Sequence, residues 1–303
     1  MPIGWIRASY DRRMSGSPFI SYAQNGEDVV LWRALGHLPP GRYVDVGAWD
    51  PTIDSVTRAF YDRGWRGTHV EPAPSLAERI RDERPEDEVV EAAITATGGG
   101  SVTLHQFPNT GLNTLEHTIA AGHQNSGREA VDIIVATTTL NDVLAASHWG
   151  TAEIHFLKVD VEGLELEVLR SIDLRMHRPW ILVVEATLPN STEPSHAEWE
   201  PLVLAAGYEF CLFDGLSRFY VASEHSDLKP ALSYPACIFD TFKRHRDVLR
   251  DDECAATRAD LERTIATQAQ ELAASRGTLD AVHASRSWRV TAPLRRLSTA
   301  LRR

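Results

Sequence analysis

Short, mostly apolar runs that carry an acidic residue at or near their end recur along the chain. The first contains Asp45 and is followed by Gly47, and later runs end at Glu71, Asp160 and Glu185. Such runs are typical of strands buried on both faces of a parallel sheet, whose carboxyl ends open into the crevice where α/β sheets bind ligands. The pattern predicts one crevice that collects acidic side chains from several strands.

Helical and turn patterns separate the first strands. An apolar stripe that includes Ile53 predicts a helix over residues 52–63, and Ser75 is predicted to cap a second helix over residues 76–84. A third strand is predicted over residues 89–94. This alternation of strands and helices predicts a doubly wound, parallel sheet.

The second half of the chain continues the alternation and then changes it. Thr139 is predicted to cap a helix over residues 140–146, and another helix is predicted over residues 237–249. Between them, residues 208–213 and 218–222 have the composition of a hairpin. We therefore predict an α/β fold with a Rossmann-like, mostly parallel sheet of seven strands and an antiparallel C-terminal hairpin.

The glycines narrow the class of ligand. Dinucleotide sites use G-x-G-x-x-G to bring the backbone close to a pyrophosphate, whereas Gly47 stands alone and residues 48–51 would obstruct that approach. A nucleoside without phosphates, such as S-adenosylmethionine (SAM), fits better, with Asp45 facing its ammonium group. Glu71 follows Asp45 by 26 residues, where nucleotide-binding units place the acid that holds a ribose diol. Alternatively, both acids are strand-end residues that accept hydrogen bonds from loop amides.

A second charged segment lies at residues 154–163. If the strand extends far enough, alternation places Lys158, Asp160 and Glu162 on one face. Three charges on a central strand are costly unless they are paired or functional. We expect Asp160 near the cofactor, and the alternative is a purely structural Lys158–Asp160 ion pair.

Two polar segments are candidates for contacts at the mouth of the crevice. Gln24 and Glu27 either fold over the cofactor or belong to a capped helix. Residues 108–128 form a long polar loop, and such loops over an α/β sheet commonly bind substrate. The substrate contacts predicted in it are Asn109, Gly111 and Asn113.

Composition excludes several classes of protein. The 303 residues are 43% hydrophobic and carry a net charge of −11, which argues against a nucleic-acid-binding protein. The three cysteines are too scattered for a disulfide framework, and His105, His117 and His123 lack the spacing of metal ligands. An apolar signal segment and a bilayer-spanning run are both absent from the sequence, so we expect a cytoplasmic protein.

The ends of the chain differ from its centre. We predict a flexible arm over residues 1–18, a main domain over 19–250, a helical extension over 251–284 and a basic amphipathic tail over 285–303. In the extension, apolar residues recur at alternating spacings of four and three, as in a coiled coil, although Gln268, Ser275 and Gly277 interrupt the pattern. The seam consists of Leu261, Ile265, Gln268, Leu272, Ser275, Leu279 and Val282.

The extension and the tail each allow two interpretations. The helix is either solvated or associated with a partner or a second copy of the chain. The tail contains six arginines and no acid, so it either lies on an anionic membrane surface or remains disordered or docked to a partner.

Several ordered motifs resemble the FkbM-type methyltransferase family, over roughly residues 19–225. They are SYAQNGED (21–28), VDVGA (44–48), FYDRGWRG (60–67), VEP (70–72), GLNTL (111–115) and LKVDVEG (157–163). The resemblance implies transfer of a methyl group from SAM to an oxygen, commonly a hydroxyl of a sugar or a macrolide-like natural product.

The resemblance also implies residue roles. SAM contacts are implied for Asp45, Gly47 and Glu71, to which we add their motif neighbours Ala48 and Pro72. The implied reaction centre consists of Lys158, Asp160 and Glu162. Asn113 stands where many relatives have serine, which indicates a specialised acceptor loop. The SWRVTAPLR segment at residues 287–295 is similar to one in enzymes that build bacterial surface polysaccharides, which favours a glycan acceptor at the inner membrane face.

The main hypothesis is a SAM-dependent O-methyltransferase that acts on a sugar hydroxyl. A base must help to remove the hydroxyl proton, and Asp160, Glu185 and His155 are candidates, with His155 favoured as a packed core residue. In a second mechanism, Asp160, Glu162 and Glu185 hold Mg²⁺. The alternative from another class is a non-catalytic scaffold in a glycan-assembly complex.

Overall fold

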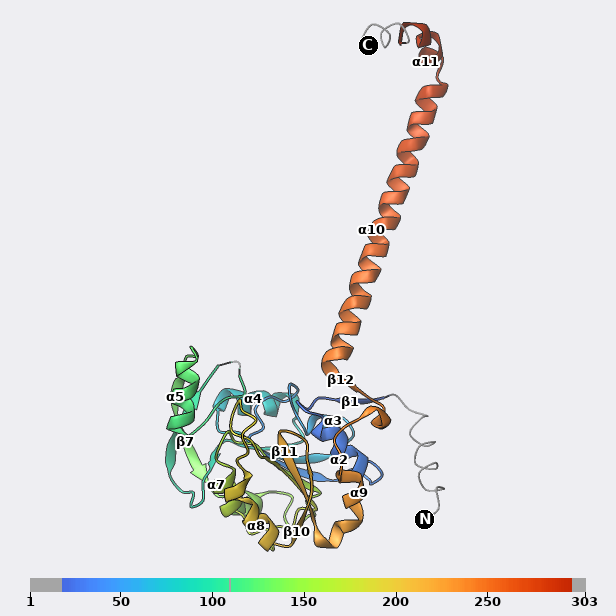
Figure 1. Cartoon of the computed structure of the whole chain (residues 1–303). Helices are drawn as coiled ribbons and strands as arrows, with labels where there is room; N and C mark the ends of the chain where they lie inside the picture. Colours follow the sequence, from blue (N-terminus) through green and yellow to red (C-terminus); the bar gives the residue numbers. More distant parts are fainter. Residues whose placement is uncertain (1–17, 109, 296–303) are drawn as a thin grey trace, which may run out of the picture. The chain divides into compact units, whose positions relative to one another are not determined.

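A computed structural model describes residues 18–108 and 110–295 (Figure 1). The chain divides into two compact units, residues 1–245 and 246–303. Except for Pro18, the predicted N-terminal arm lies outside the described residues, as do Asn109 and the last eight residues of the predicted tail.

A mostly parallel sheet forms the centre of the first unit, which confirms the predicted α/β class. Among the described residues, seven strands form this sheet. In spatial order they are β10 (Tyr208–Phe213), β11 (Ser217–Ala222), β9 (Ile181–Glu185), β8 (Phe156–Val159), β2 (Arg42–Val46), β3 (Arg66–Val70) and β4 (Glu88–Val90). β11 runs antiparallel to both of its neighbours, and the other pairs are parallel.

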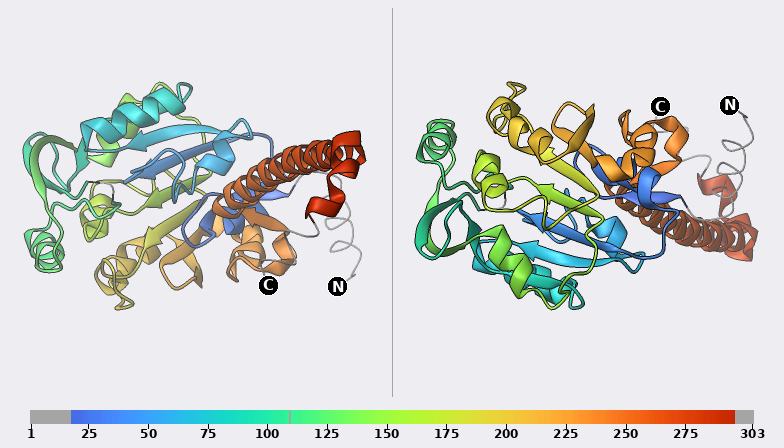
Figure 2. Two further views of the ribbon diagram at one scale, coloured as in Figure 1. Left: turned by 90° about the horizontal axis from the view of Figure 1, so that it is seen from above. Right: turned by 90° about the horizontal axis from the view of Figure 1, so that it is seen from below.

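Helices cover both faces of the sheet (Figure 2). One face packs on α6 (Leu140–Ala146), α7 (Glu165–Arg170) and α8 (Glu200–Ala205), and the other on α2 (Glu27–Leu35), α3 (Arg58–Tyr61) and α9 (Lys229–Leu232). Successive residues of β9 alternate between the two cores, since Leu182 and Val184 belong to the first and Ile181 and Val183 to the second. This alternation explains why the central strands are apolar throughout.

The predicted third strand is wrong in its extent, because it divides into two elements. Residues 88–90 form β4 at the edge of the main sheet, whereas β5 (Ala93–Ile94) leaves it and pairs with β7 (Val131–Thr138). β7 also pairs with β6 (Ser101–Gln106). The segment that connects β6 to β7 contains α5 (His117–Asn125). This small three-stranded sheet supplies one wall of the pocket described below.

Two helix predictions in the first half need correction. The helix expected over residues 52–63 is limited to α3, and Ile53 is exposed. Hydrogen bonds hold the preceding segment as a loop, since Asp50 Oδ1 accepts from the Thr52 and Ile53 amides. Ser75 does not cap the next helix, because α4 (Pro74–Glu83) already includes Ser75 and has Ala73 at its N-cap.

The cap predicted at Thr139 is confirmed, since its hydroxyl accepts a hydrogen bond from the Asp142 amide at the start of α6. The helix predicted over residues 237–249 is wrong over residues 237–244, whereas residues 245–249 are helical. Residues 237–244 contain a 3₁₀ turn, η3 (Ile238–Asp240), and β12 (Phe242–Arg244), which pairs in parallel with β1 (Phe19–Ser21). Two further 3₁₀ turns are η1 (His196–Glu198) and η2 (Ser223–Leu228).

After β12, α10 begins at His245 and ends at Ala284, so all but its first residue belongs to the C-terminal unit. The short α11 (Arg286–Val290), which Ser285 caps, follows it. α10 continues through Gly277 without a break. Across the described residues, 18–108 and 110–295, no helix is both long and apolar enough to cross a membrane.

Candidate active site

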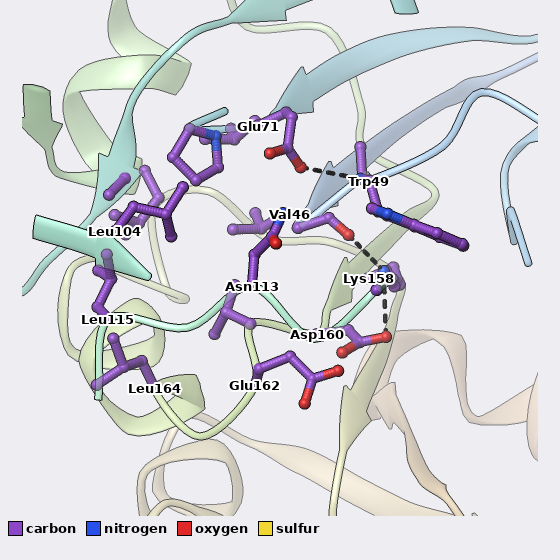
Figure 3. A pocket seen from close by; sticks show the side chains of 18 of the residues that line it. Val46, Trp49, Glu71, Leu104, Asn113, Leu115, Lys158, Asp160, Glu162 and Leu164 are labelled. Atoms are coloured by element: carbon purple, nitrogen blue, oxygen red, sulfur yellow. Dashed lines mark hydrogen bonds and ion pairs between the residues drawn. The ribbon is translucent and has the colours of Figure 1, made fainter. Parts of the chain in front are cut away.

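A pocket opens where the carboxyl ends of β2, β3 and β8 meet (Figure 3). Gly47, Glu71 and Asp160 each come directly after one of these strands, and all three line the pocket. β2 lies between β3, which follows it in the chain, and β8, which comes much later. The chain order therefore reverses at this point, and such switch points are where open α/β sheets bind ligands.

The backbone after β2 and the backbone after β8 approach each other so closely that residue 47 must be a glycine. Its φ is +79°, in the left-handed region that favours glycine, and a Cβ there would lie 1.8 Å from the carbonyl oxygen of Asp160. Its amide donates a hydrogen bond to the Val70 carbonyl (3.0 Å). The lone glycine thus lets the ends of three strands converge at the floor of the pocket.

Lys158 joins this floor to two carboxylates. Its Nζ donates to the Gly47 carbonyl (2.9 Å) and lies 3.4 Å from both Asp45 Oδ1 and Asp160 Oδ2. Burial opposes the charge of the lysine, but Asp160 and Asp45 outweigh this effect and raise the pKa of Lys158. Lys158 is therefore a permanent cation, and its charge is neutralised within the protein.

The structure does not bring Asp45 into the pocket. β2 continues one residue beyond it to Val46, so the carboxyl lies under the sheet, where Oδ2 accepts a hydrogen bond from Thr57 (3.0 Å). Burial alone would raise the pKa of Asp45, but Lys158 and then His69 lower it well below its usual range. Asp45 therefore positions Lys158, and it does not line the pocket in which the sequence predicted its ligand contact.

Glu71 does line the pocket, and its carboxyl accepts two loop amides as well. Oε2 accepts from the Trp49 amide and Oε1 from the Ala73 amide, both at 2.9 Å. Burial raises the pKa of Glu71 to about 7. A carboxylate oxygen can accept more than one hydrogen bond, so these contacts orient Glu71 and still allow it to bind a ligand hydroxyl.

Acidic groups gather on the opposite side of the pocket. The condition for the predicted alternation of residues 158, 160 and 162 is not met, because β8 ends at Val159 and Glu162 lies in a turn with a φ of +55°. The turn nevertheless brings both Asp160 and Glu162 to the pocket. Burial, then Asp160 and Glu165, raise the pKa of Glu162 to about 8.

Two further carboxyls lie behind this side. Glu165, which was not predicted as a site residue, accepts hydrogen bonds from the Val161 and Gly163 amides on one oxygen and holds the turn (3.2 Å each). Glu185 is buried beside Asp160 but does not line the pocket as predicted. Burial, then Asp160 and Glu162, raise the pKa of Glu185 far above neutrality, so its carboxyl holds a proton.

The other predicted cofactor and substrate residues do not all line the pocket. Gln24, Ala48, Pro72, Gly111 and Asn113 line the pocket as expected, whereas Asn109 lies outside the described residues. Asn113 Oδ1 accepts the Phe107 amide (2.9 Å), which fixes the amide side chain at the pocket. Glu27 is buried away from the pocket, where it accepts the Asn25 amide and burial raises its pKa to about 8.

Apolar side chains form the remaining wall. Leu104 comes from β6, Leu115 precedes α5, and Leu164 precedes α7; Figure 3 shows the three on the side away from Lys158. This wall was not predicted, because nothing in the sequence of β6 indicates which surface the strand covers. Trp49 and Asp54, from the loop after β2, also line the pocket and were missed.

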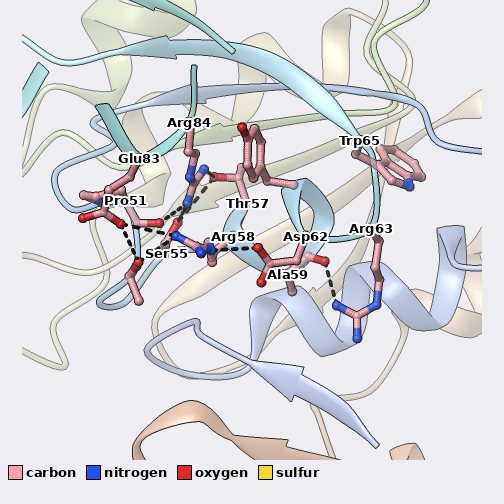
Figure 4. A network of polar contacts seen from close by, with 12 residues as sticks. Pro51, Ser55, Thr57, Arg58, Ala59, Asp62, Arg63, Trp65, Glu83 and Arg84 are labelled. Atoms are coloured by element: carbon pink, nitrogen blue, oxygen red, sulfur yellow. Dashed lines mark hydrogen bonds and ion pairs between the residues drawn. The ribbon is translucent and has the colours of Figure 1, made fainter. Parts of the chain in front are cut away.

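Arg84, at the end of α4, fixes that loop from behind (Figure 4). Its guanidinium is fully buried and donates to Thr57 Oγ1 and Ser55 Oγ, both at 2.7 Å, and to the Pro51 carbonyl. Thr57 in turn donates to Asp45. The loop wall and the floor of the pocket are thus parts of one buried polar network.

The histidines do not build a metal site. Among the described residues, no group of three or more His, Cys, Asp or Glu side chains is arranged to hold a metal ion, so the Mg²⁺ hypothesis gains no support. His105 contacts His117 (2.8 Å) and Asp132 (2.6 Å), and His123 packs against Phe107. The expectation for His155 is confirmed, because it packs between two tryptophans at the start of β8 and accepts the Arg42 amide.

A parallel sheet with a pocket at its switch point defines the doubly wound α/β class of ligand-binding proteins. Within this class, the chain matches the model of the methyltransferase FkbM domain over residues 45–210, which is more than half of its length. The protein belongs to this methyltransferase family.

Solved structures of methyltransferases resemble the chain only weakly. A TehB-like SAM-dependent methyltransferase from Corynebacterium glutamicum is 8% identical, with 72% of this chain and 96% of that chain covered and a TM-score of 0.36. The SAM-bound magnesium protoporphyrin IX methyltransferase from Synechocystis is 12% identical (72% and 91% covered, TM-score 0.36). An O-methyltransferase from Bacillus cereus in complex with SAH is 13% identical (72% and 87%, TM-score 0.32). These scores are too low to add to the assignment, and no curated protein matches the chain.

Proposed function

We propose that this protein transfers a methyl group from SAM to a hydroxyl oxygen of a sugar or glycan. The observation that carries the proposal is the charge of the pocket. Among the residues that the structure describes, four acids line it, Asp54, Glu71, Asp160 and Glu162, against a single cation, Lys158, which is already paired with carboxylates. Such a pocket repels phosphate groups and attracts a cation.

The residues present fit SAM. Glu71 would hold the ribose diol, and the apolar residues Pro72 and Leu104 would pack against the adenine ring. Asp160 and Glu162 would face the positive charges of the ammonium and sulfonium groups. When bound, the cofactor supplies a methyl group on a positively charged sulfur, which is a reactive donor to an oxygen nucleophile.

Asp160 is the best candidate for the base that takes the hydroxyl proton. It lines the pocket and is paired with Lys158. By contrast, Glu185 does not line the pocket, and its raised pKa keeps it protonated. His155 lies at the opposite end of β8. A carboxylate within hydrogen-bond reach can hold the acceptor hydroxyl and receive its proton as the new bond forms.

The acceptor class rests on the family resemblance and on the uncharged polar groups that line the pocket. Gln24 and Asn113 line the pocket together with the carboxyls, and amide and carboxylate groups bind uncharged hydroxyls. This set suits a polyol better than a purely apolar acceptor.

Calorimetric titration of SAM tests the proposal, with NAD as a control ligand. We expect SAM to bind and NAD not to bind. Glu71→Gln should weaken SAM binding about ten-fold or more, because it removes a charged hydrogen-bond acceptor. Glu78→Gln, an exposed position on α4, is the matched control and should bind as the wild type does.

Failure of the folded wild type to bind SAM would contradict the proposal and favour the scaffold hypothesis. Unchanged affinity in Glu71→Gln would contradict the assignment of the ribose contact. If SAM binds, methyl transfer from labelled SAM to an array of monosaccharides and glycans tests the acceptor class.

A further inference from the structure

The long helix α10 carries an exposed apolar stripe. Along residues 250–284 every side chain is exposed except that of Ala259, which is half-buried. Isolated helices draw little stability from propensity, and most helices in proteins are stabilised by packing of an apolar face. Ile265 is 64% exposed and Leu272 is 53% exposed, so the stripe lacks such packing within the described chain.

The exposed apolar residues occupy the a and d positions of a heptad repeat. With Leu261 at d, the a positions are Ile265, Leu272 and Leu279, and the later d positions are Gln268, Ser275 and Val282. Three heptads with this spacing are the signature of a two-helix seam. Gly277 falls at position f, on the outer side of the helix, so the interruption of the seam that was predicted at this residue does not occur.

Charges and polar residues indicate the partner. In a parallel pair, position g of one helix faces position e of the next heptad in the other. Glu271 at g would therefore face Arg276 at e of a second copy, and the same pair would form again across the symmetry axis. Gln268 and Ser275 would each meet their own counterpart, and both side chains can donate and accept hydrogen bonds.

We propose that α10 forms a parallel, in-register two-stranded coiled coil with α10 of a second copy of this chain. The seam is complementary to itself in charge and in the positions of its polar residues. Association would remove the exposed leucine, isoleucine and valine side chains from water, which is the driving force for this kind of pairing. The protein would then be a dimer that carries two methyltransferase units.

The mass of the full-length protein in solution tests the proposal. Light scattering after size exclusion should give twice the mass of one chain. The double variant Ile265→Asp, Leu272→Asp should be a monomer, because two charges would be buried in the seam of each helix. The matched double variant Ala266→Asp, Ala273→Asp places the same charges at b positions and should remain a dimer. A monomeric wild type, or a seam variant that remains dimeric, would overturn the proposal.

Cross-linking tests the orientation. In a Cys254→Ser background, which removes the native cysteine of α10, Ser275→Cys places a thiol in the seam and Ala274→Cys places one at the outer position c. Mild oxidation should join two chains through residue 275 far more efficiently than through residue 274. Equal cross-linking at both positions, or none at residue 275 in a dimer, would overturn the parallel register. These measurements do not involve SAM, so their outcome is independent of the proposed enzymatic activity.

Discussion

Substitution of Gly47 by alanine tests whether the convergence of three strands builds the pocket. Two physical effects act at this residue. Its φ of +79° is unfavourable for any residue with a Cβ, and that Cβ would lie 1.8 Å from the Asp160 carbonyl oxygen. The blocking atom belongs to the backbone directly after β8, so it cannot rotate away as a flexible side chain would. The strand end itself must shift.

A matched glycine separates the two effects. Gly99 has a φ of +73°, but a Cβ there would have no atom within 4 Å. Gly99→Ala should therefore show the backbone effect alone, a loss of about 1–2 kcal/mol in the free energy of unfolding. Gly47→Ala adds overpacking of about 1–3 kcal/mol, for a total loss of about 2–5 kcal/mol.

Urea unfolding followed by tryptophan fluorescence measures both variants, and titration of SAM measures the effect on the pocket. We expect Gly47→Ala to be the less stable variant and to bind SAM more weakly, because its strand shift displaces Asp160. Gly99→Ala should retain the wild-type affinity. Equal losses of stability in the two variants, within about 0.5 kcal/mol, would refute the close-packing argument. Wild-type SAM affinity in Gly47→Ala would refute the link between this turn and the site.

Two further predictions concern charge. Burial raises the pKa values of Glu71 and Glu162 to about 7 and about 8, so both carboxyls hold protons at lower pH, and a bound cation favours their negative forms. SAM affinity measured by calorimetry should therefore rise between about pH 6 and 8 and then level off. A double Glu→Gln variant at these positions should lose this pH dependence, which distinguishes titration of the two carboxyls from titration of the ligand's own amino group. A flat wild-type profile would contradict the prediction. Arg84→Met should lower the free energy of unfolding by about 3–5 kcal/mol, because it leaves three buried acceptors, the Pro51 carbonyl and the Ser55 and Thr57 hydroxyls, without their donor. Arg81→Met, which breaks only the exposed Arg81–Glu91 pair, should cost less than about 1 kcal/mol, and similar losses in the two arginine variants would contradict the role of the network.

The sequence was most informative where a local pattern decides the structure. Apolar runs predicted the central strands. Of the four acids predicted to share one crevice, Asp45, Glu71, Asp160 and Glu185, Glu71 and Asp160 line the pocket together with Gly47. The lone glycine correctly indicated a tight turn, whose physical reason is the approach of the Asp160 carbonyl. These features depend on which residue follows each apolar run and on the type of its side chain, both of which can be read along the chain.

The tertiary structure decided what distant residues do to one another. Asp45 has the sequence context of a cofactor ligand, but one further residue of β2 places its carboxyl under the sheet beside Lys158. The segment after β2 has a helical stripe, but Arg84 binds three of its polar groups and holds it as a loop. The apolar wall at Leu104 exists because β5 leaves the main sheet and pairs with β7. Each outcome depends on contacts between residues far apart in the chain, and a local pattern contains no information about them.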